Sequence, residues 1–122
     1  MRNEPFTIRK RLRSFKYAAN GIYLLISREH NAWIHCFAAI CVTIAGIMVR
    51  LSAAEWIAII LSIGMVLAAE AVNSSIERLA DFVTEEQRDA IKQTKDLAAG
   101  SVLILAIAAA AVGLIIFIPK LF

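Results

Sequence analysis

The stretch Val66-Leu-Ala-Ala-Glu70-Ala-Val-Asn73-Ser-Ser-Ile-Glu77-Arg-Leu-Ala-Asp81 begins as a membrane span and ends as a polar helix. On an α-helix, which advances about 100° per residue, its polar side chains fall within an arc of roughly 100°. These side chains belong to Glu70, Asn73, Ser74, Glu77 and Asp81. The stretch therefore predicts one helix with a polar stripe along one face.

Glu70 is the unusual member of this stripe. The fourteen residues from Trp56 to Ala69 carry no charge. At ~1.5 Å per residue, Glu70 lies ~21 Å beyond Trp56, within a hydrocarbon core about 30 Å thick. A carboxylate at that depth is costly unless it faces a partner or a water-filled cavity. We therefore expect Glu70 to mark the functional site.

The composition indicates a membrane protein. The chain has 122 residues, of which 60% are hydrophobic. A soluble chain this short could not bury so much apolar surface. We expect a single integral-membrane domain over residues 1–122.

The hydrophobic pattern predicts an all-α membrane protein with three transmembrane helices and an N-terminal amphipathic surface helix. The surface helix covers residues 7–30, with Thr7 as a possible cap and apolar positions spaced by three and four residues. The spans cover residues 32–49, 56–82 and 97–118. We expect a turn from Arg50 to Glu55, a cap at Thr84 before a charged segment, and an end to the last span at Pro119.

The basic residues indicate the orientation. Seven of the thirteen lysines and arginines precede residue 30, and four lie between residues 78 and 95. Because positively charged segments stay in the cytoplasm, we expect the N-terminus and the 78–95 segment to be cytoplasmic. We therefore expect a multi-pass membrane protein with its N-terminus on the cytoplasmic side.

This topology brings three polar clusters to the cytoplasmic interface: Glu29 to Asn31, the stripe from Glu70 to Asp81, and Lys95-Asp96. Carboxylates from separate helices could share a divalent cation, and Mg²⁺ favours one or two carboxylates together with phosphate oxygens. The chain contains neither G-x-x-x-x-G-K-[ST] nor G-x-G-x-x-G. An ion or proton pathway through Glu70 and a purely structural scaffold are therefore alternatives to phosphate chemistry.

Several motifs taken together resemble a known family. These are Ser14-Phe-Lys-Tyr17-Ala-x-x-Gly21, Glu29-x-Asn31-x-x-Ile34-His35, Glu70-x-x-Asn73-x-x-x-Glu77, Asp81 and Lys95-Asp96. The set resembles the bacterial diacylglycerol kinase family of small integral-membrane lipid kinases, over nearly the whole chain. The resemblance implies a homotrimer of three-span subunits, with composite active sites at the cytoplasmic interface.

The resemblance also implies a role for individual residues, with ATP as co-substrate and Mg²⁺ as cofactor. Glu70 matches the general base that takes the proton of the lipid hydroxyl, and Glu29 and Glu77 match metal-binding carboxylates that also lie at the nucleotide. The remaining residues implied at the nucleotide are Lys10, Tyr17, Asn73, Glu86, Lys95 and Asp96. We expect no nucleic-acid partner.

The choice of lipid depends on two segments. Asn31-x-x-Ile34-His35 and Lys95-Asp-Leu-Ala-Ala-Gly100 look more like the undecaprenol kinases within this family than like its diacylglycerol kinases. Undecaprenol is therefore favoured and diacylglycerol comes next, with Asn31, His35 and Ala99 as expected lipid contacts beside Glu70. His35 could equally serve as a helix-packing hydrogen-bond partner.

Overall fold

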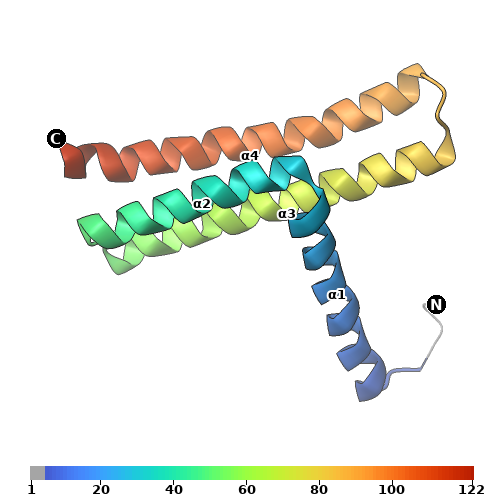
Figure 1. Ribbon diagram of the computed structural model, residues 1–122, viewed down its shortest axis with the longest axis horizontal. Helices are drawn as coiled ribbons and strands as arrows, with labels where there is room; N and C mark the ends of the chain where they lie inside the picture. Colours follow the sequence, from blue (N-terminus) through green and yellow to red (C-terminus); the bar gives the residue numbers. More distant parts are fainter. Residues whose placement is uncertain (1–4) are drawn as a thin grey trace.

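The computed structural model describes residues 5–122, so residues 1–4 of the expected domain lie outside the described part. The described chain forms four helices: α1 (Ile8–Arg28), α2 (His30–Val49), α3 (Ala53–Val83) and α4 (Asp89–Leu121). Figure 1 shows α2, α3 and α4 running as an elongated bundle from which α1 departs at a steep angle. The predicted all-α class is confirmed. By length and composition, α2, α3 and α4 can each cross a membrane.

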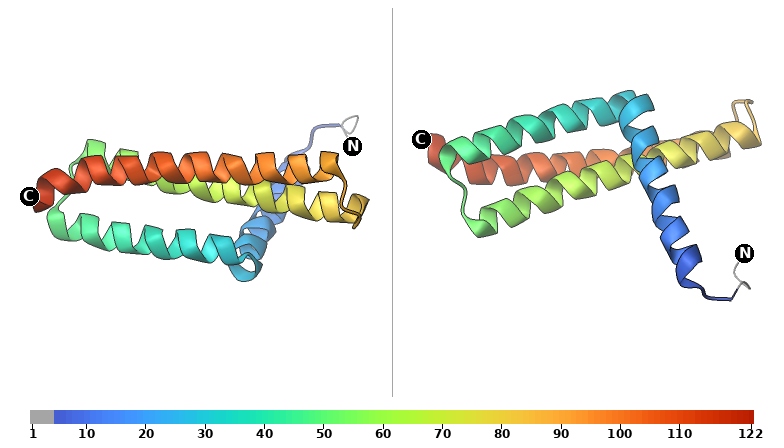
Figure 2. Two further views of the ribbon diagram at one scale, coloured as in Figure 1. Left: turned by 90° about the horizontal axis from the view of Figure 1, so that it is seen from above. Right: turned by 60° about the horizontal axis from the view of Figure 1, so that its bottom comes forward.

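The junction between α1 and α2 has a defined geometry. Glu29 has an extended backbone (φ −99°, ψ 112°) and interrupts the helix, so α1 ends two residues before its predicted limit. The indole N–H of Trp33 donates to the carbonyl of Ile26 at 2.6 Å across this break. That bond satisfies one of the carbonyls that a helix C-terminus leaves without a partner. The two views in Figure 2 show that α1 consequently turns away from the bundle.

The start of α1 agrees with its expected cap. The side-chain oxygen of Thr7 accepts a hydrogen bond from the backbone N–H of Lys10 at 3.2 Å. Large apolar side chains of the predicted stripe remain exposed along this helix, and they are Ile8, Leu12, Phe15, Ile22 and Ile26. The amphipathic surface position of α1 remains a prediction.

The turn between α2 and α3 is shorter than predicted. It spans Arg50 to Ser52, and the expectation of a turn reaching Glu55 is wrong. Ser52 and Glu55 form a capping box: the Ser52 hydroxyl oxygen accepts from the Glu55 N–H at 3.2 Å, and the Glu55 carboxylate accepts from the Ser52 N–H at 2.9 Å. Helix α3 therefore starts three residues before Trp56, which was its predicted first residue.

The connection between α3 and α4 also differs from the prediction. Thr84 ends α3 and does not cap the next helix; its hydroxyl accepts from the Glu86 N–H at 3.0 Å within the loop. Helix α4 begins at Asp89 and continues past Pro119 to Leu121. The predicted end at Pro119 is wrong. Proline lacks a backbone N–H and so removes one helical hydrogen bond, a loss that α4 tolerates because the helix ends only two residues later.

Helices α3 and α4 form the closest pair of the bundle. An ion pair joins the two helices at each end of their contact. Lys95 Nζ lies 2.6 Å from Asp81 Oδ1 at one end, and Lys120 Nζ lies 3.0 Å from Glu55 Oε1 at the other. The small buried core near the second end consists of Leu51, Ile59 and Ile116. Most large apolar side chains of the bundle remain exposed, as expected for helices that face lipid.

Gly46 packs closely against side chains of the α2–α3 turn and the start of α3, and this leads to a prediction about stability. A Cβ at Gly46 would lie 2.8 Å from Leu51 Cδ1 and 2.9 Å from Trp56 Cη2. We expect Gly46→Ala to destabilise the fold by about 1–3 kcal/mol, the usual cost of overpacking. Thermal unfolding in detergent measures this effect as a lower midpoint. Gly64→Ala is the matched control, since a Cβ there meets nothing within 4 Å. Equal midpoints for the two variants would contradict this account.

Candidate active site

The polar stripe of α3 is buried where it enters the apolar part of the bundle. Glu70 is only 2% exposed, and Asn73 and Ser74 are also buried. His35 of α2 faces this region, with its Nε2 atom 3.6 Å from Glu70 Oε2. A protonated imidazole at this position would form an ion pair with the carboxylate. His35 is therefore the polar side chain of α2 that lies nearest to this buried carboxylate.

Asn73 carries an unpaired polar atom. Its Oδ1 is buried and has no hydrogen-bond partner among the residues that the structure describes. An unsatisfied buried acceptor costs about 1–3 kcal/mol, so natural proteins retain few of them. This oxygen lies one turn from Glu70 and one turn from Glu77, and it remains available to a donor from outside the described chain.

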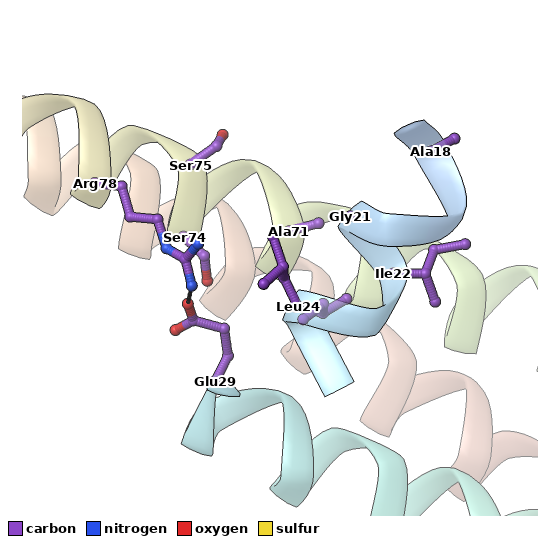
Figure 3. Close-up of a pocket in the computed structure, with 10 residues that line it drawn as sticks. Ala18, Gly21, Ile22, Leu24, Glu29, Ala71, Ser74, Ser75 and Arg78 are labelled. Carbon is purple, nitrogen blue, oxygen red and sulfur yellow. Dashed lines mark hydrogen bonds and ion pairs between the residues drawn. The ribbon is translucent and has the colours of Figure 1, made fainter. Parts of the chain in front are cut away.

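Glu29 forms an ion pair with a residue of α3. Its Oε1 lies 2.9 Å from Arg78 Nη2, and the two side chains meet at the helix break between α1 and α2. They close one end of a cavity of about 320 Å³ between α1 and α3, whose other walls include Leu24 and Ser74 (Figure 3). The Glu29 carboxylate therefore lies at the end of a largely apolar cavity.

A second cavity, the polar cavity, lies at the end of the bundle beyond Glu70. It measures about 290 Å³ and is lined by α3, the 84–88 loop and the first turns of α4. Lys95 Nζ lies 2.6 Å from Asp81 Oδ1 and 3.7 Å from Glu77 Oε2 within it. Lys92 pairs with Asp96 at 2.6 Å. A charged ligand that entered this cavity could form ion pairs with these lysines and carboxylates, in place of the ion pairs that they now form with one another.

Two more of the expected residues line the polar cavity. Glu86 lies in its wall and binds Arg88 at 2.8 Å. Ala99 also lines it, and so stands with the expected nucleotide residues instead of in the groove that His35 lines. The structure thus gathers Glu77, Glu86, Lys95, Asp96 and Ala99 at one place.

Other expected site residues are not gathered there. Lys10 and Tyr17 lie on α1, which departs from the bundle, and neither lines the cavities described above. Tyr17 is 66% exposed. Asn31 is exposed in the first turn of α2, since that helix begins at His30 and not at residue 32 as predicted. Within one chain, these three residues stand apart from the polar cavity.

The expected metal ligands, Glu29 and Glu77, each have a cationic neighbour in the single chain. Arg78 pairs with Glu29, and Lys95 lies near Glu77. Over residues 5–122, no group of three or more acidic, histidine or cysteine side chains forms a ready metal site. Mg²⁺ commonly takes one or two carboxylates and obtains its remaining ligands from phosphates and water, so it does not require a cluster of three such side chains. An ammonium already held between Glu77 and Asp81 shows that these carboxylates suit a cation.

Comparison with known proteins identifies the family. The model of the family described as prokaryotic diacylglycerol kinase matches residues 16–117. The chain belongs to this family. Undecaprenol kinase of Bacillus subtilis is 39% identical over 109 residues, which cover 89% of this chain and 89% of that protein. Diacylglycerol kinase of Synechocystis is 33% identical over 109 residues, which cover 88% of this chain and 62% of that protein.

Membership of the diacylglycerol kinase family makes the chain a lipid kinase, and its three apolar helices make it a multi-pass membrane protein. The resemblance noted in the sequence is thereby confirmed. A lipid kinase also accounts for Lys95 and Asp96 beside a carboxylate stripe, which neither the ion-pathway alternative nor the scaffold alternative requires.

Sequence reasoning missed two contributions to this site. Arg78 was counted only among the basic residues of the 78–95 segment and was given no place in the site, although it is the single basic residue of α3. Asp81 was placed on the stripe but was given no role, whereas it makes the shortest contact to Lys95. The fourteen-residue separation of Asp81 and Lys95 gave no local signal for this pair, because it depends on how the 84–88 loop returns the chain.

Proposed function

We propose that this protein transfers the γ-phosphoryl group of ATP to the hydroxyl of a membrane lipid. Undecaprenol is the favoured acceptor and diacylglycerol is the next. The observation that carries the proposal is the position of Glu70. It is 2% exposed in the apolar part of the bundle, while the polar cavity begins two helical turns further along the same helix at Glu77. A lipid hydroxyl and a soluble nucleotide can therefore approach one site from opposite sides.

The nucleotide would occupy the polar cavity and the surface next to it. Lys95 supplies a positive charge to the phosphates once it leaves Asp81, and Asp96 and Glu86 offer acceptors to the sugar or base. Asn73 lies between this cavity and Glu70, where its unpaired oxygen can accept a hydrogen bond from the ligand. Phosphoryl transfer depends chiefly on such positioning and charge neutralisation.

Glu29 and Glu77 would hold Mg²⁺ together with the phosphate oxygens. When bound, that ion supplies charge neutralisation on the transferred group. The side chains of this chain have to release their present partners first, namely Arg78 from Glu29 and Lys95 from Glu77. Arg78 can then contact phosphate oxygens, and Lys95 can do so once it has also left Asp81.

Glu70 would act as the general base that receives the proton of the lipid hydroxyl. Its burial keeps water away from the carboxylate, so the proton acceptor is preserved for a hydroxyl that arrives from the membrane. His35, 3.6 Å from Glu70, would hold the carboxylate in place and contact the lipid head. Asn31 lies one turn before His35 on the same helix.

A homotrimer would complete the site. Lys10 and Tyr17 are expected at the nucleotide, yet α1 carries them away from the polar cavity of their own chain. A neighbouring subunit whose cavity lies under α1 would receive both residues. We propose such composite sites at the cytoplasmic face of the bacterial cytoplasmic membrane.

A competition assay tests the choice of lipid. Purified protein in detergent would receive equal amounts of undecaprenol and diacylglycerol together with labelled ATP and Mg²⁺. We expect most label in the polyprenol, because the segments at His35 and Lys95 resemble undecaprenol kinases. Label mainly in diacylglycerol would reverse the choice of substrate and leave the kinase assignment intact.

A further inference from the structure

The Glu29–Arg78 ion pair orients a carboxylate at the break between α1 and α2. Glu29 stands directly before α2, yet its side chain makes no capping hydrogen bond to that helix. Its Oε1 atom instead accepts from Arg78 Nη2 at 2.9 Å, from a residue 49 positions further along the chain. Figure 3 shows these two side chains pointing toward each other at the end of the cavity between α1 and α3. The orientation of the Glu29 carboxylate is thus set by Arg78 and not by helix capping.

This ion pair is open to exchange with ligands from solution. The Arg78 side chain is 50% exposed and the Glu29 side chain is 26% exposed. An ion pair that solvent reaches typically changes an equilibrium constant by no more than about fivefold. Arg78 is also the single basic residue of α3, so no other side chain of that helix can take its place. A charged ligand can therefore replace either member of the pair at small cost.

Two kinds of ligand would compete for the two members of this pair. A guanidinium 2.9 Å from Glu29 Oε1 excludes a divalent ion from that oxygen, and its positive charge repels such an ion from the rest of the carboxylate. Phosphate oxygens have the opposite effect, because arginine binds them in a two-pronged arrangement that draws the guanidinium away from Glu29. Metal binding at Glu29 and nucleotide binding are therefore linked through Arg78.

We propose that Arg78 occupies the cation position at Glu29 in the empty protein and moves to the nucleotide phosphates when they arrive. The proposal rests on the function proposed above, in which Glu29 is a metal ligand, and it adds a regulatory role for Arg78. Glu29 then takes up a divalent ion readily only when nucleotide is present. By thermodynamic linkage, the ion and the nucleotide raise the affinity for each other by the same factor.

Mn²⁺ binding to the nucleotide-free protein tests the competition. The full-length protein in detergent would be titrated with Mn²⁺, and the EPR signal of the free ion would report how much remains unbound. We expect Arg78→Gln to bind Mn²⁺ about 3–10-fold more tightly than the wild-type protein, because a competing positive charge is removed. Arg78→Lys keeps the charge without the two-pronged geometry and should lie between them. Arg28→Gln is the matched control: it removes the same charge from an exposed residue next to Glu29, and it should match the wild-type protein.

A double-mutant cycle shows whether the competition occurs at Glu29. A defect in folding would weaken metal binding, so a gain in affinity is a signature that a structural role alone does not produce. In a Glu29→Gln background, Arg78→Gln should bring no gain, because the carboxylate for which the two cations compete is gone. A gain that persists in that background would overturn the proposal. Mn²⁺ affinity in Arg78→Gln that equals or falls below that of Arg28→Gln would do the same.

Steady-state kinetics test the movement of Arg78 to the phosphates. We expect Arg78→Gln to raise the KM for MgATP about fivefold, with part of the loss restored in Arg78→Lys and no change in Arg28→Gln. An unchanged KM in Arg78→Gln would overturn this part of the proposal. The Mn²⁺ measurements need no catalysis, so they separate the two claims. Absence of phosphoryl transfer by the wild-type protein would refute the proposed function, whereas the Mn²⁺ affinities alone decide whether Arg78 competes at Glu29.

Discussion

Glu70→Gln should lower kcat for phosphoryl transfer to the lipid by about 10²–10⁴-fold, the range that a positioned general base contributes. Glutamine has the size and shape of glutamate and can still contact His35, so binding of the lipid should change little. The loss should therefore appear in kcat and not in KM. The measurement is a labelled-ATP assay with the lipid acceptor over a range of concentrations.

Glu55→Gln is the matched control for that experiment. It makes the same acid-to-amide change at the opposite end of α3, where Glu55 pairs with Lys120 at 3.0 Å. A glutamine there can still accept the capping hydrogen bond from Ser52, so we expect nearly normal turnover. If Glu70→Gln kept a kcat close to that of Glu55→Gln, Glu70 would not be the base.

Lys95→Met should lower kcat/KM for ATP by about 10²–10³-fold, which is typical when one electrostatic contact to a reacting group is removed. The methionine keeps the apolar stem of lysine but cannot neutralise phosphate charge. The variant also leaves Asp81 and Glu77 without the ammonium that now lies between them, so their negative charge would repel the nucleotide. Lys95→Arg should retain part of the activity because it keeps the charge.

Lys120→Met provides the control for Lys95→Met. Lys120 lies at the other end of α4 and pairs with Glu55, far along the helix from the polar cavity. We expect its kinetic constants to match those of the wild-type protein. Equal kcat/KM for ATP in Lys95→Met and Lys120→Met would exclude Lys95 from the nucleotide site.

The helices could be predicted from the sequence because hydrophobic periodicity and span length are local signals. The residues at which the helices begin and end are harder to predict. The capping box formed by Ser52 and Glu55 has the sequence pattern Ser-x-x-Glu, and it explains why α3 begins before its predicted first residue, Trp56. Thr84 was expected to cap α4, yet its hydroxyl serves the loop instead, and the sequence alone does not distinguish these two uses.

The candidate site could be predicted in part for a similar reason. The spacing of Glu70, Asn73 and Glu77 places them on one face of a helix, and their positions in the structure follow from that spacing. The Glu29–Arg78 pair was not predictable, because it depends on the break in the helix at Glu29 and on the packing of α3 against it. The proposed contacts of Lys10 and Tyr17 with a neighbouring subunit involve a second chain, so residue spacing within this chain does not predict them.

The central claim is that one site joins a soluble nucleotide to a lipid hydroxyl, and a stoichiometric transfer assay tests it most directly. Purified protein in lipid nanodiscs would receive undecaprenol, Mg²⁺ and ATP labelled in the γ-phosphate, and both products would be quantified. The account predicts one labelled lipid monophosphate for each ADP formed. ADP formed without labelled lipid, or no ATP consumed by folded protein, would contradict it.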